Sequence, residues 1–481
     1  MNIRLVVNLL GKALAVEGAL MLPSLLVSLY YDGGDWLALL LAAMLVSAVG
    51  GALAMLVRPH NDNLRAREGF AAVALIWVFM SMFGALPFYF HGSIPVYTDC
   101  FFETVSGFTT TGATILKDVE ALPRGLLFWR SFTHWVGGMG VLVLSLALIP
   151  HMGARSQHLL KAESTGPAPG KLVPHIGKSS KILYELYLAL SIIHFAALLP
   201  CGLDWYDSLI HMFGSAGTGG FSNYNASVGH FQSPAVDAVT ATFMLLFGVN
   251  FTMYYLLLNK QWRMVLKNEE LRLYLGIVAG SVVLIAINIL PSVGNWWEAL
   301  RQSYFQVSSI ITTTGYSTAN FDLWPQLSRT ILVVLMLLGA CAGSTGGGIK
   351  MVRLALLFKA MARQVKQAIR PRSVATIKID GRPVDEVTIS RVLVFFFGYL
   401  LIILVAMLIV SVDNFSFETN LTAVLSAVSN IGPGLGAVGP TGNFAGFSIL
   451  SKWVLSICML VGRLEIYPIL MLFAPSIWRK N

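Results

Sequence analysis

Long apolar stretches recur along the whole chain of 481 residues, and short polar segments separate them. An α-helix needs about 20 apolar residues to cross the hydrocarbon core of a bilayer. Ten stretches reach that length and are predicted to be membrane-spanning helices: 12–31, 36–57, 70–91, 127–149, 182–201, 235–258, 272–291, 329–349, 390–412 and 449–474. The hydrophobic pattern therefore predicts an integral membrane protein of the all-α class.

Four shorter, half-apolar stretches lie between some of these spans, at 98–108, 205–215, 296–310 and 417–429. They are too short to cross the bilayer, and each ends in a segment rich in Gly, Thr and Ser. Irregular backbone at membrane depth is tolerated only where protein or a water-filled cavity surrounds it. We therefore interpret the four stretches as re-entrant pore helices, each followed by a pore-lining loop.

The spans and pore helices form a unit that occurs four times: span, half-helix, loop of small residues, span. The pattern predicts a pseudo-fourfold arrangement of these repeats around one pore, preceded by two N-terminal transmembrane helices. The predicted boundaries are 1–69 for the two leading helices, 70–150 for repeat 1, 151–258 for repeat 2 with its preceding cytoplasmic loop, 259–369 for repeat 3 with an intramembrane glycine-rich loop, and 370–481 for repeat 4 with its preceding cytoplasmic hairpin.

The low content of charged residues excludes a water-soluble fold of this size. Only 12% of the residues are charged and 56% are hydrophobic, whereas soluble proteins have about 25% charged residues, so membrane lipid is expected to cover most of the exterior. The basic residues lie between apolar stretches without interleaved aromatic residues, which favours a membrane surface over nucleic acid. With both termini cytoplasmic, most of the 33 Lys and Arg residues fall on the inner side.

The residues that could support catalysis or bind a metal do not form a recognisable set. The four cysteines are far apart and have no CxxC pair, so they are interpreted as isolated thiols. The nine histidines form no HxxxH or HExxH pair. Because no nucleophile and base converge at membrane depth, the sequence predicts neither an enzyme nor an organic cofactor.

One glycine in each of the four loops anchors an alignment of the repeats: Gly112, Gly219, Gly315 and Gly434. Rings of backbone carbonyls can replace the hydration shell of potassium, and glycine permits the dihedral angles that aim carbonyls inward. Each half-helix would also direct the negative end of its dipole toward the pore. We predict a potassium-binding filter made of Thr110, Thr111, Gly112, Gly217, Thr218, Gly219, Thr313, Thr314, Gly315, Gly432, Pro433 and Gly434. We expect the ion itself to contact Thr110, Thr111, Thr218, Thr313, Thr314, Ile431 and Gly432.

The loop sequences are TTTGA at 109–113, AGTGGF at 216–221, TTTGY at 312–316 and NIGPGLG at 430–436, accompanied by GSTGGGIK at 343–350 and GRLEIY at 462–467. Together they resemble the Trk/Ktr/HKT superfamily of potassium transporters, and within it the TrkH branch. The resemblance covers essentially the whole chain, including the two leading spans. It implies potassium uptake across the bacterial inner membrane, a homodimer, and gating by a cytosolic nucleotide-binding ring subunit of the TrkA type.

The four loops are unequal, and this affects the expected selectivity. In the glycine-anchored alignment, repeats 2 and 4 replace Thr110 with Gly217 and Gly432. A less symmetric ion cage should discriminate less strongly against sodium. A proton- or sodium-coupled symporter that uses the same filter is the alternative function, although only Glu17 and Glu465 are candidate mid-membrane acids and the repeats are parallel rather than inverted.

The span at 329–349 contains a glycine-rich break that could act as a gate. Glycine costs about 1 kcal/mol relative to alanine in a helix, so three in succession favour an unwound segment, and the family resemblance implies that this segment is an intramembrane loop below the filter. Close helix packing through small residues is the alternative. Arg463 would repel cations there and could hydrogen-bond the loop, or it could pair with Glu465. Lys350 could belong to the gate or anchor the chain at the inner surface. The predicted gate residues are Gly343, Gly346, Gly347, Gly348, Lys350 and Arg463.

Basic segments at 151–181 and 350–388 are expected on the cytoplasmic side. They could contact anionic lipid, or they could form the docking surface of a regulatory subunit. Residues 370–388 have a strand–turn–strand pattern with Asp380-Gly381 as the hairpin turn, and a folded hairpin suits a docking surface.

Three acidic residues mark the outer side of the pore helices: Asp99, Glu103 and Glu418. A carboxylate near a helix N-terminus is stabilised by the helix dipole. We interpret the three as stabilising pore-helix N-termini in preference to the alternative, which is attraction of cations to the mouth of the pore.

Overall fold

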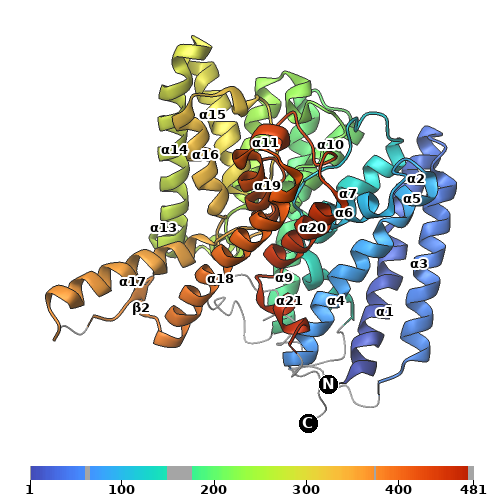
Figure 1. The fold of residues 1–481 in the computed structure, drawn as a ribbon, viewed down its shortest axis with the longest axis horizontal. Coiled ribbons are helices and arrows are strands. Elements are labelled where there is room, and N and C mark those ends of the chain that lie inside the picture. The colour runs from blue at the N-terminus through green and yellow to red at the C-terminus, as the bar shows by residue number, and fades with distance from the viewer. Residues whose placement is uncertain (1, 60–65, 149–175, 373–374, 475–481) are drawn as a thin grey trace.

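The computed structural model describes residues 2–59, 66–148, 176–372 and 375–474. Most of the basic segment expected at 151–181 therefore lies outside the described residues. Helices make up nearly all of the described chain, as the hydrophobic pattern predicted (Figure 1). The start of α1 (Ile3–Leu20) and the end of α21 (Tyr467–Leu472) lie at the same end of the molecule.

Six crossings in the described chain are long and apolar enough to span a membrane, and they comprise the two leading spans and the first span of every repeat. Each is helical through its apolar stretch, apart from a one-residue turn at Met21 between α1 and α2 and another at Ala85 between α4 and α5. The six are α1 with α2 (Leu22–Tyr31), α3 (Trp36–Leu56), α4 (Ala66–Gly84) with α5 (Leu86–His91), α9 (Ile176–Leu198), α14 (Glu269–Val293) and α18 (Glu386–Val410).

Large apolar side chains on the outer faces of these helices are exposed. Leu284 of α14 is 55% exposed and Leu404 of α18 is 58% exposed. Contiguous apolar surface of this kind is costly in water but matches the hydrocarbon layer of a bilayer. The outer surface is therefore that of a membrane protein.

The four predicted pore helices are present as short, buried helices in the upper half of Figure 1. Three of them begin with a side-chain cap, in which Asp204, Asn295 or Ser416 accepts a hydrogen bond from the backbone of the first turn. Such caps allow a helix to begin at membrane depth without unpaired amide groups. The pore helices are α6 (Tyr97–Phe108), α10 (Trp205–Gly217), α15 (Trp296–Ile311) and α19 (Phe417–Ser429).

The second span of every repeat is interrupted, whereas the sequence analysis expected a break only in repeat 3. In repeat 1, α7 (Arg124–Leu148) contains Gly140 in a non-helical conformation. In repeat 2, α11 (Pro234–Phe247) and α12 (Phe251–Leu258) meet at 91°. In repeat 3, α16 (Gln326–Leu337) and α17 (Met351–Ile369) flank a long loop, and in repeat 4 a turn at 464–466 separates α20 (Ile449–Arg463) from α21.

The strand–turn–strand pattern at 370–388 forms the predicted hairpin. Strands β1 (Lys378–Ile379) and β2 (Arg382–Pro383) pair antiparallel around Asp380-Gly381, both of which have positive φ. The Asp380 carboxylate accepts hydrogen bonds of 2.8 Å from the Asn268 side chain and from the backbone N–H of Glu269, at the start of α14. The hairpin is thus fixed to the beginning of repeat 3. The short helix α13 (Trp262–Lys267) precedes that start.

The two leading helical crossings pack against each other through small residues. A methyl group added at Gly50 of α3 would lie 2.3 Å from the backbone nitrogen of Ala15, so the two backbones are in close contact. Asp35, at the start of α3, accepts a hydrogen bond of 2.7 Å from the backbone N–H of Leu126. This bond attaches the leading helices to the second span of repeat 1.

Candidate functional site

The four loops that follow the pore helices share one backbone conformation. The chain leaves each helix through a residue with left-handed dihedral angles, at Thr110, Thr218, Thr313 and Asn430, where φ lies between 53° and 58°. The next residue in each loop donates a hydrogen bond of 2.8–3.0 Å to a carbonyl in the last turn of the pore helix. This bond fixes the start of the loop against the end of the pore helix.

A glycine with positive φ follows in each loop, at Gly112, Gly220, Gly315 and Gly432. This register corrects the predicted one, because Gly219 lies one position before the equivalent glycine and Gly434 lies two positions after it. Gly217 is the last residue of α10, and the backbone N–H of Gly434 bonds to Val438 in the outer loop. The equivalent triplets are 110–112, 218–220, 313–315 and 430–432.

The four glycines close a ring. A methyl group added at Gly112 would lie 2.0 Å from the Gly219 carbonyl oxygen, and the same distance separates the Gly220 position from the oxygen of Thr314. A methyl group at Gly315 would lie 2.0 Å from the Ile431 oxygen. The Gly432 position is 2.7 Å from the Thr111 oxygen, which returns the sequence of contacts to repeat 1. Every repeat therefore abuts the next through a glycine and a carbonyl.

This ring assembles most of the predicted filter residues at one place. Thr111, Thr314, Ile431 and Gly219 supply its carbonyl oxygens, and Thr110, Thr218 and Thr313 precede them. Four carbonyl dipoles gathered at one place provide an environment suited to a monovalent cation that has shed water. Gly220 and Asn430 belong to this set but were missed by the sequence analysis, although each repeat has a Thr or Asn two residues before its ring glycine.

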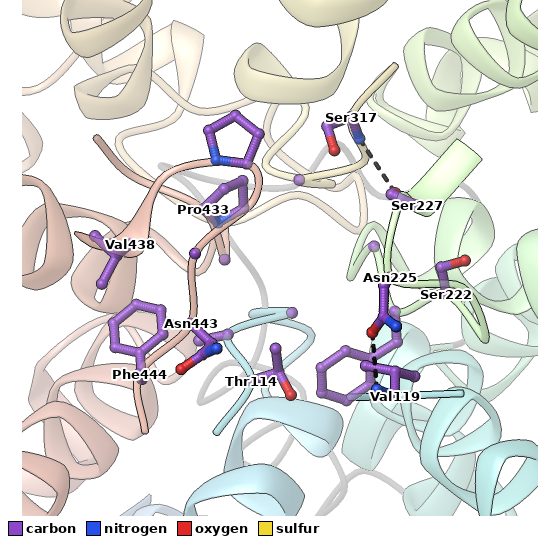
Figure 2. Close-up of a pocket in the computed structure, with 18 of the residues that line it drawn as sticks. Thr114, Val119, Ser222, Asn225, Ser227, Ser317, Pro433, Val438, Asn443 and Phe444 are labelled. Atoms are coloured by element: carbon purple, nitrogen blue, oxygen red, sulfur yellow. Dashed lines mark hydrogen bonds between the residues drawn. The ribbon is translucent and has the colours of Figure 1, made fainter. Parts of the chain in front are cut away.

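An open cavity lies above the ring, lined by loops from all four repeats (Figure 2). Neighbouring loops are tied across its rim: Asn225 accepts a hydrogen bond of 2.8 Å from the backbone N–H of Val119, and Ser227 accepts one of 3.3 Å from that of Ser317. Burial and a hydrogen bond to Asp207 raise the pKa of Tyr224, in the wall of this cavity, to about 12. The tyrosine therefore stays neutral at physiological pH.

The three outer acidic residues form ion pairs. Glu103 contacts Arg130 at 2.7 Å, Asp99 contacts Lys452 at 2.7 Å, and Glu418 contacts Arg329 at 2.5 Å. Asp99 and Glu418 lie in the first turns of their pore helices, as the stabilising interpretation requires. Glu103 lies beyond the first turn and accepts hydrogen bonds from Thr114 and Ile115, so it fixes the loop that leaves the ring.

The glycine-rich loop at 338–350 lies directly against the inner side of the filter segments. The backbone N–H of Gly347 donates a hydrogen bond of 2.7 Å to the Thr313 hydroxyl. A methyl group at Gly347 would lie 2.3 Å from the Ser429 oxygen of repeat 4. The loop therefore contacts repeats 3 and 4 immediately below the ring, where the sequence analysis expected a gate.

The far side of this loop is attached to the bend in repeat 2. Gly248 accepts a hydrogen bond of 3.0 Å from Cys341, and Phe251 donates one of 3.1 Å to Gly343. Glu270 of α14 accepts bonds from the backbone N–H groups of Ala342 and Val352, on either flank of the loop. The sequence analysis missed Gly248 and Glu270 because nothing in the sequence places them beside residues that follow 72 to 93 positions later.

Arg463 links the loop to repeat 1. It donates hydrogen bonds of 2.8 Å to the Thr345 oxygen and 2.6 Å to the Gly137 oxygen. The expected contact with the glycine-rich loop is therefore present. The alternative partner, Glu465, pairs instead with Arg353 at 2.5 Å.

Lys350 is buried, and its ammonium group donates to the carbonyl of Gly346 within the same loop. A lysine held in this way is part of the loop and not an exposed anchor at the membrane surface. All the residues predicted for the gate are thus neighbours in the structure.

Four half-helices whose loops close a carbonyl ring, inside an apolar helical scaffold, define an integral membrane protein with the architecture of an ion pore. Comparison with known proteins gives the same class. Residues 38–480 match the family model TrkH, described as a cation transport protein. The chain belongs to the TrkH family, whose members are transporters and not enzymes, and the resemblance inferred from the loop motifs is confirmed.

Individual relatives match over the full chain. The Trk system potassium uptake protein TrkH of Salmonella typhimurium is 36% identical, and the match covers all of both chains. The TrkG protein of Escherichia coli, also named a Trk system potassium uptake protein, is 30% identical over all of this chain and 99% of its own. The crystal structure of the potassium transporter TrkH from Vibrio parahaemolyticus superposes with a TM-score of 0.89 at 33% identity, covering both chains fully.

Proposed function

We propose that the chain takes up potassium across the bacterial cytoplasmic membrane through a gated pore with a carbonyl-lined filter. The observation that carries this proposal is the closed ring of Thr111, Gly219, Thr314 and Ile431 oxygens against the four ring glycines. Oxygens held by the backbone can replace the hydration shell of potassium at little cost in reorganisation. The relatives named above, which are potassium uptake proteins and a potassium transporter, support the choice of ion.

The gate in this proposal is the loop at 338–350 together with Arg463. The loop lies against Thr313 and Ser429 just below the ring, and the Arg463 guanidinium is bound to the carbonyl of Thr345 in the same loop. A fixed positive charge on the path of a cation raises the barrier to its passage. Opening would therefore require the loop and Arg463 to move away from the axis together.

The selectivity for potassium over sodium is proposed to be moderate. Three repeats place a threonine two residues before the ring glycine, whereas repeat 4 places Asn430 there, and its amide donates to Thr111 of repeat 1 at 3.0 Å. The filter segment of repeat 4 thus carries an amide side chain where the other three segments carry a hydroxyl. An uneven ring should fit potassium less uniquely than a fourfold-symmetric one.

The assembly around the pore is also part of the proposal. We place the chain in the inner membrane as a multi-pass protein with both termini cytoplasmic, as a homodimer gated by a nucleotide-binding ring subunit of the TrkA type. The relatives are components of the Trk system, and the hairpin fixed by Asp380 to the start of repeat 3 offers a folded surface on that side. Lipid would cover the exposed apolar faces of α14 and α18.

A symporter that couples potassium to protons or sodium is the alternative. Glu17 is the observation in its favour, because the side chain is fully buried and neither carboxylate oxygen has a partner among the described residues. Glu17 itself belongs to α1, outside the four repeats, and its carboxylate lies beside Gly84 of α4, the first span of repeat 1.

A liposome flux assay tests the proposal. The purified protein is reconstituted, and the uptake rates of potassium, rubidium and sodium are measured with and without an imposed proton gradient. The channel proposal predicts potassium uptake at least as fast as rubidium uptake, slower but measurable sodium uptake, and no dependence on the proton gradient beyond its electrical effect. Gly315→Ala should abolish uptake, whereas Gly276→Ala, at a position with open space around it, should not.

Three results would overturn parts of this proposal. Absence of potassium flux in the wild-type protein would reject the pore, and uphill potassium movement driven by the proton gradient at zero membrane potential would establish the symporter. Near-complete exclusion of sodium would reject only the moderate selectivity.

A further inference from the structure

Two residues one turn apart on the second span of repeat 1 face the filter segment of the neighbouring repeat. Arg130 and His134 lie on one face of α7, because residues four apart in a helix are neighbours on its surface. Both side chains are almost fully buried, with exposed fractions of 3% and 0%. A buried arginine and a buried histidine at membrane depth are expensive unless their polar atoms are bound.

The pore helix of repeat 1 binds both of them from one side. Glu103 accepts a hydrogen bond of 2.7 Å from the Arg130 Nε. The Gly107 carbonyl, one turn further along α6, lies 2.7 Å from the His134 Nδ1. Since a carbonyl can only accept, Nδ1 carries the proton. Matching pairs of residues on α6 and α7 thus fix the orientation of both side chains.

On the other side, the same two residues contact the filter segment of repeat 2. A methyl group at Gly219 would lie 2.4 Å from the His134 ring. The ring of Phe221 contacts that imidazole at a tilt of 31°, with centroids 4.1 Å apart. The Arg130 guanidinium lies 3.4 Å above the Phe221 ring and donates a hydrogen bond of 3.0 Å to the Ser222 oxygen. The segment at 219–222 is therefore packed against α7.

The contact with His134, and not the backbone conformation, requires glycine at position 219. Its φ is not in the left-handed region that disfavours other residues, unlike that of Gly220. What excludes a side chain is the imidazole behind it. The oxygen of Gly219 is also the one against which Gly112 closes the ring. The position of one of the four ring carbonyls thus depends on where the His134 ring lies.

We propose that His134 is a positioning residue for ion selectivity, which sets the Gly219 carbonyl at the distance that favours potassium over sodium. This inference rests on the proposed function as a potassium pore. Removal of the imidazole would leave space directly behind Gly219, and the segment could relax toward it. A ring in which one carbonyl is free to move can adapt to a smaller cation.

The test measures the ratio of sodium to potassium uptake in proteoliposomes, because a ratio is insensitive to how often the gate is open. His134→Ala should raise this ratio about tenfold, equivalent to about 1.4 kcal/mol of lost discrimination. His134→Phe keeps a ring of similar size without the donor to Gly107, and the ratio should stay within about twofold of wild type. His194→Ala is the matched control, because His194 is an equally buried histidine that stacks on Phe243, away from the filter segments.

A reciprocal substitution covers the possibility that His134→Ala does not fold. Gly219→Ala places a methyl group where the imidazole lies and should raise the same ratio, and the double variant Gly219→Ala/His134→Ala should restore it toward wild type. Such non-additivity is the signature of direct contact.

The outcomes separate the two levels of the argument. If the wild-type protein carries no potassium, the proposed function fails and this inference fails with it. If the wild-type protein selects potassium but His134→Ala and Gly219→Ala leave the ratio unchanged, or His194→Ala changes it equally, the role of His134 is rejected while the pore stands.

Discussion

The filter segments and the interrupted second spans belong to the same four repeats, yet only the filter segments resemble one another. All four filter segments pass through a left-handed residue and a ring glycine, with equivalent hydrogen bonds to the pore helix. The interruptions range from a single non-helical glycine at Gly140 to a loop of 13 residues between α16 and α17. The half of the protein that holds the ring is therefore close to fourfold, and the half that holds the interruptions is not.

This difference separates two tasks. A cation at the centre of a ring needs similar oxygens on all sides, which constrains four segments to one geometry. A gate needs only one element that can occupy or leave the path, so three repeats are free to differ. In the proposed gate, repeat 3 supplies the loop and repeat 4 supplies Arg463. Repeat 1 supplies the carbonyl to which Arg463 is bound, and repeat 2 supplies the bend to which the loop is attached.

The largest expected effect concerns the common geometry. Gly220→Ala would place a methyl group 2.0 Å from the Thr314 oxygen at a φ of 77°, which an L-residue adopts only at a cost. We expect potassium flux to fall by about a hundredfold or more. Gly276→Ala, in open space on α14, is the control and should retain wild-type flux in the same liposome assay. Normal flux in Gly220→Ala would show that the ring register is wrong.

The next effect concerns the charge below the ring. Arg463→Ala should raise potassium flux about tenfold, equivalent to about 1.4 kcal/mol, which is well below the ~4 kcal/mol between two unit charges 4 Å apart near a protein surface. Arg463→Lys keeps the charge but cannot bind the carbonyls of Thr345 and Gly137 together. Its potassium flux should therefore lie between that of the wild-type protein and that of Arg463→Ala. Unchanged flux in a well-folded Arg463→Ala protein would remove this residue from the gate.

A smaller effect is expected at the bond between filter and loop. Thr313→Val removes the hydroxyl that accepts from the Gly347 N–H, and loss of about 1 kcal/mol should increase the open fraction about fivefold. Single-channel recording gives this fraction directly. Thr110→Val is the comparison, since it deletes the equivalent hydroxyl in repeat 1 and should alter ion binding without altering opening. Equal opening in the two variants would contradict an asymmetric gate.

The smallest effect is expected furthest from the ring. Glu269 at the start of α14 pairs with Lys359 of α17, and both side chains are partly exposed, at 28% and 37%. Such pairs contribute about 0.2–1 kcal/mol and are weakened by salt. Glu269→Gln should therefore change the open fraction by no more than about fivefold, and the difference should shrink at high ionic strength. An effect as large as that of Arg463→Ala would show that the Glu269–Lys359 pair, and not Arg463, is the main contact that keeps the gate closed.

The sequence analysis predicted the elements whose signals are local. Apolar length identified the six continuous spans, the short half-apolar stretches became α6, α10, α15 and α19, and Asp380-Gly381 marked the hairpin turn. The contact of Arg463 with the glycine-rich loop was also expected, because a guanidinium at membrane depth needs acceptors and an unwound loop has free carbonyls.

The parts that the sequence did not predict depend on contacts between distant segments. The bend at Gly248 follows an ordinary apolar run, and only its attachment to Cys341 of repeat 3 explains it. The alignment of repeat 2 failed because Gly219 and Gly220 are adjacent glycines with different reasons for being glycine. Gly220 is required by its positive φ, whereas Gly219 is required by the His134 ring behind it. A single sequence does not distinguish these two causes.

The left-handed threonines carry a consequence for the folding equilibrium. Thr110, Thr218 and Thr313 have φ between 53° and 58°, where a β-branched residue is an outlier. At roughly 1–2 kcal/mol each, the three cost about 3–6 kcal/mol if they add. A cation that binds only the native ring offsets this cost by mass action. The proposed function therefore predicts that potassium stabilises the folded state, so the melting temperature of the purified protein should rise with potassium more than with sodium.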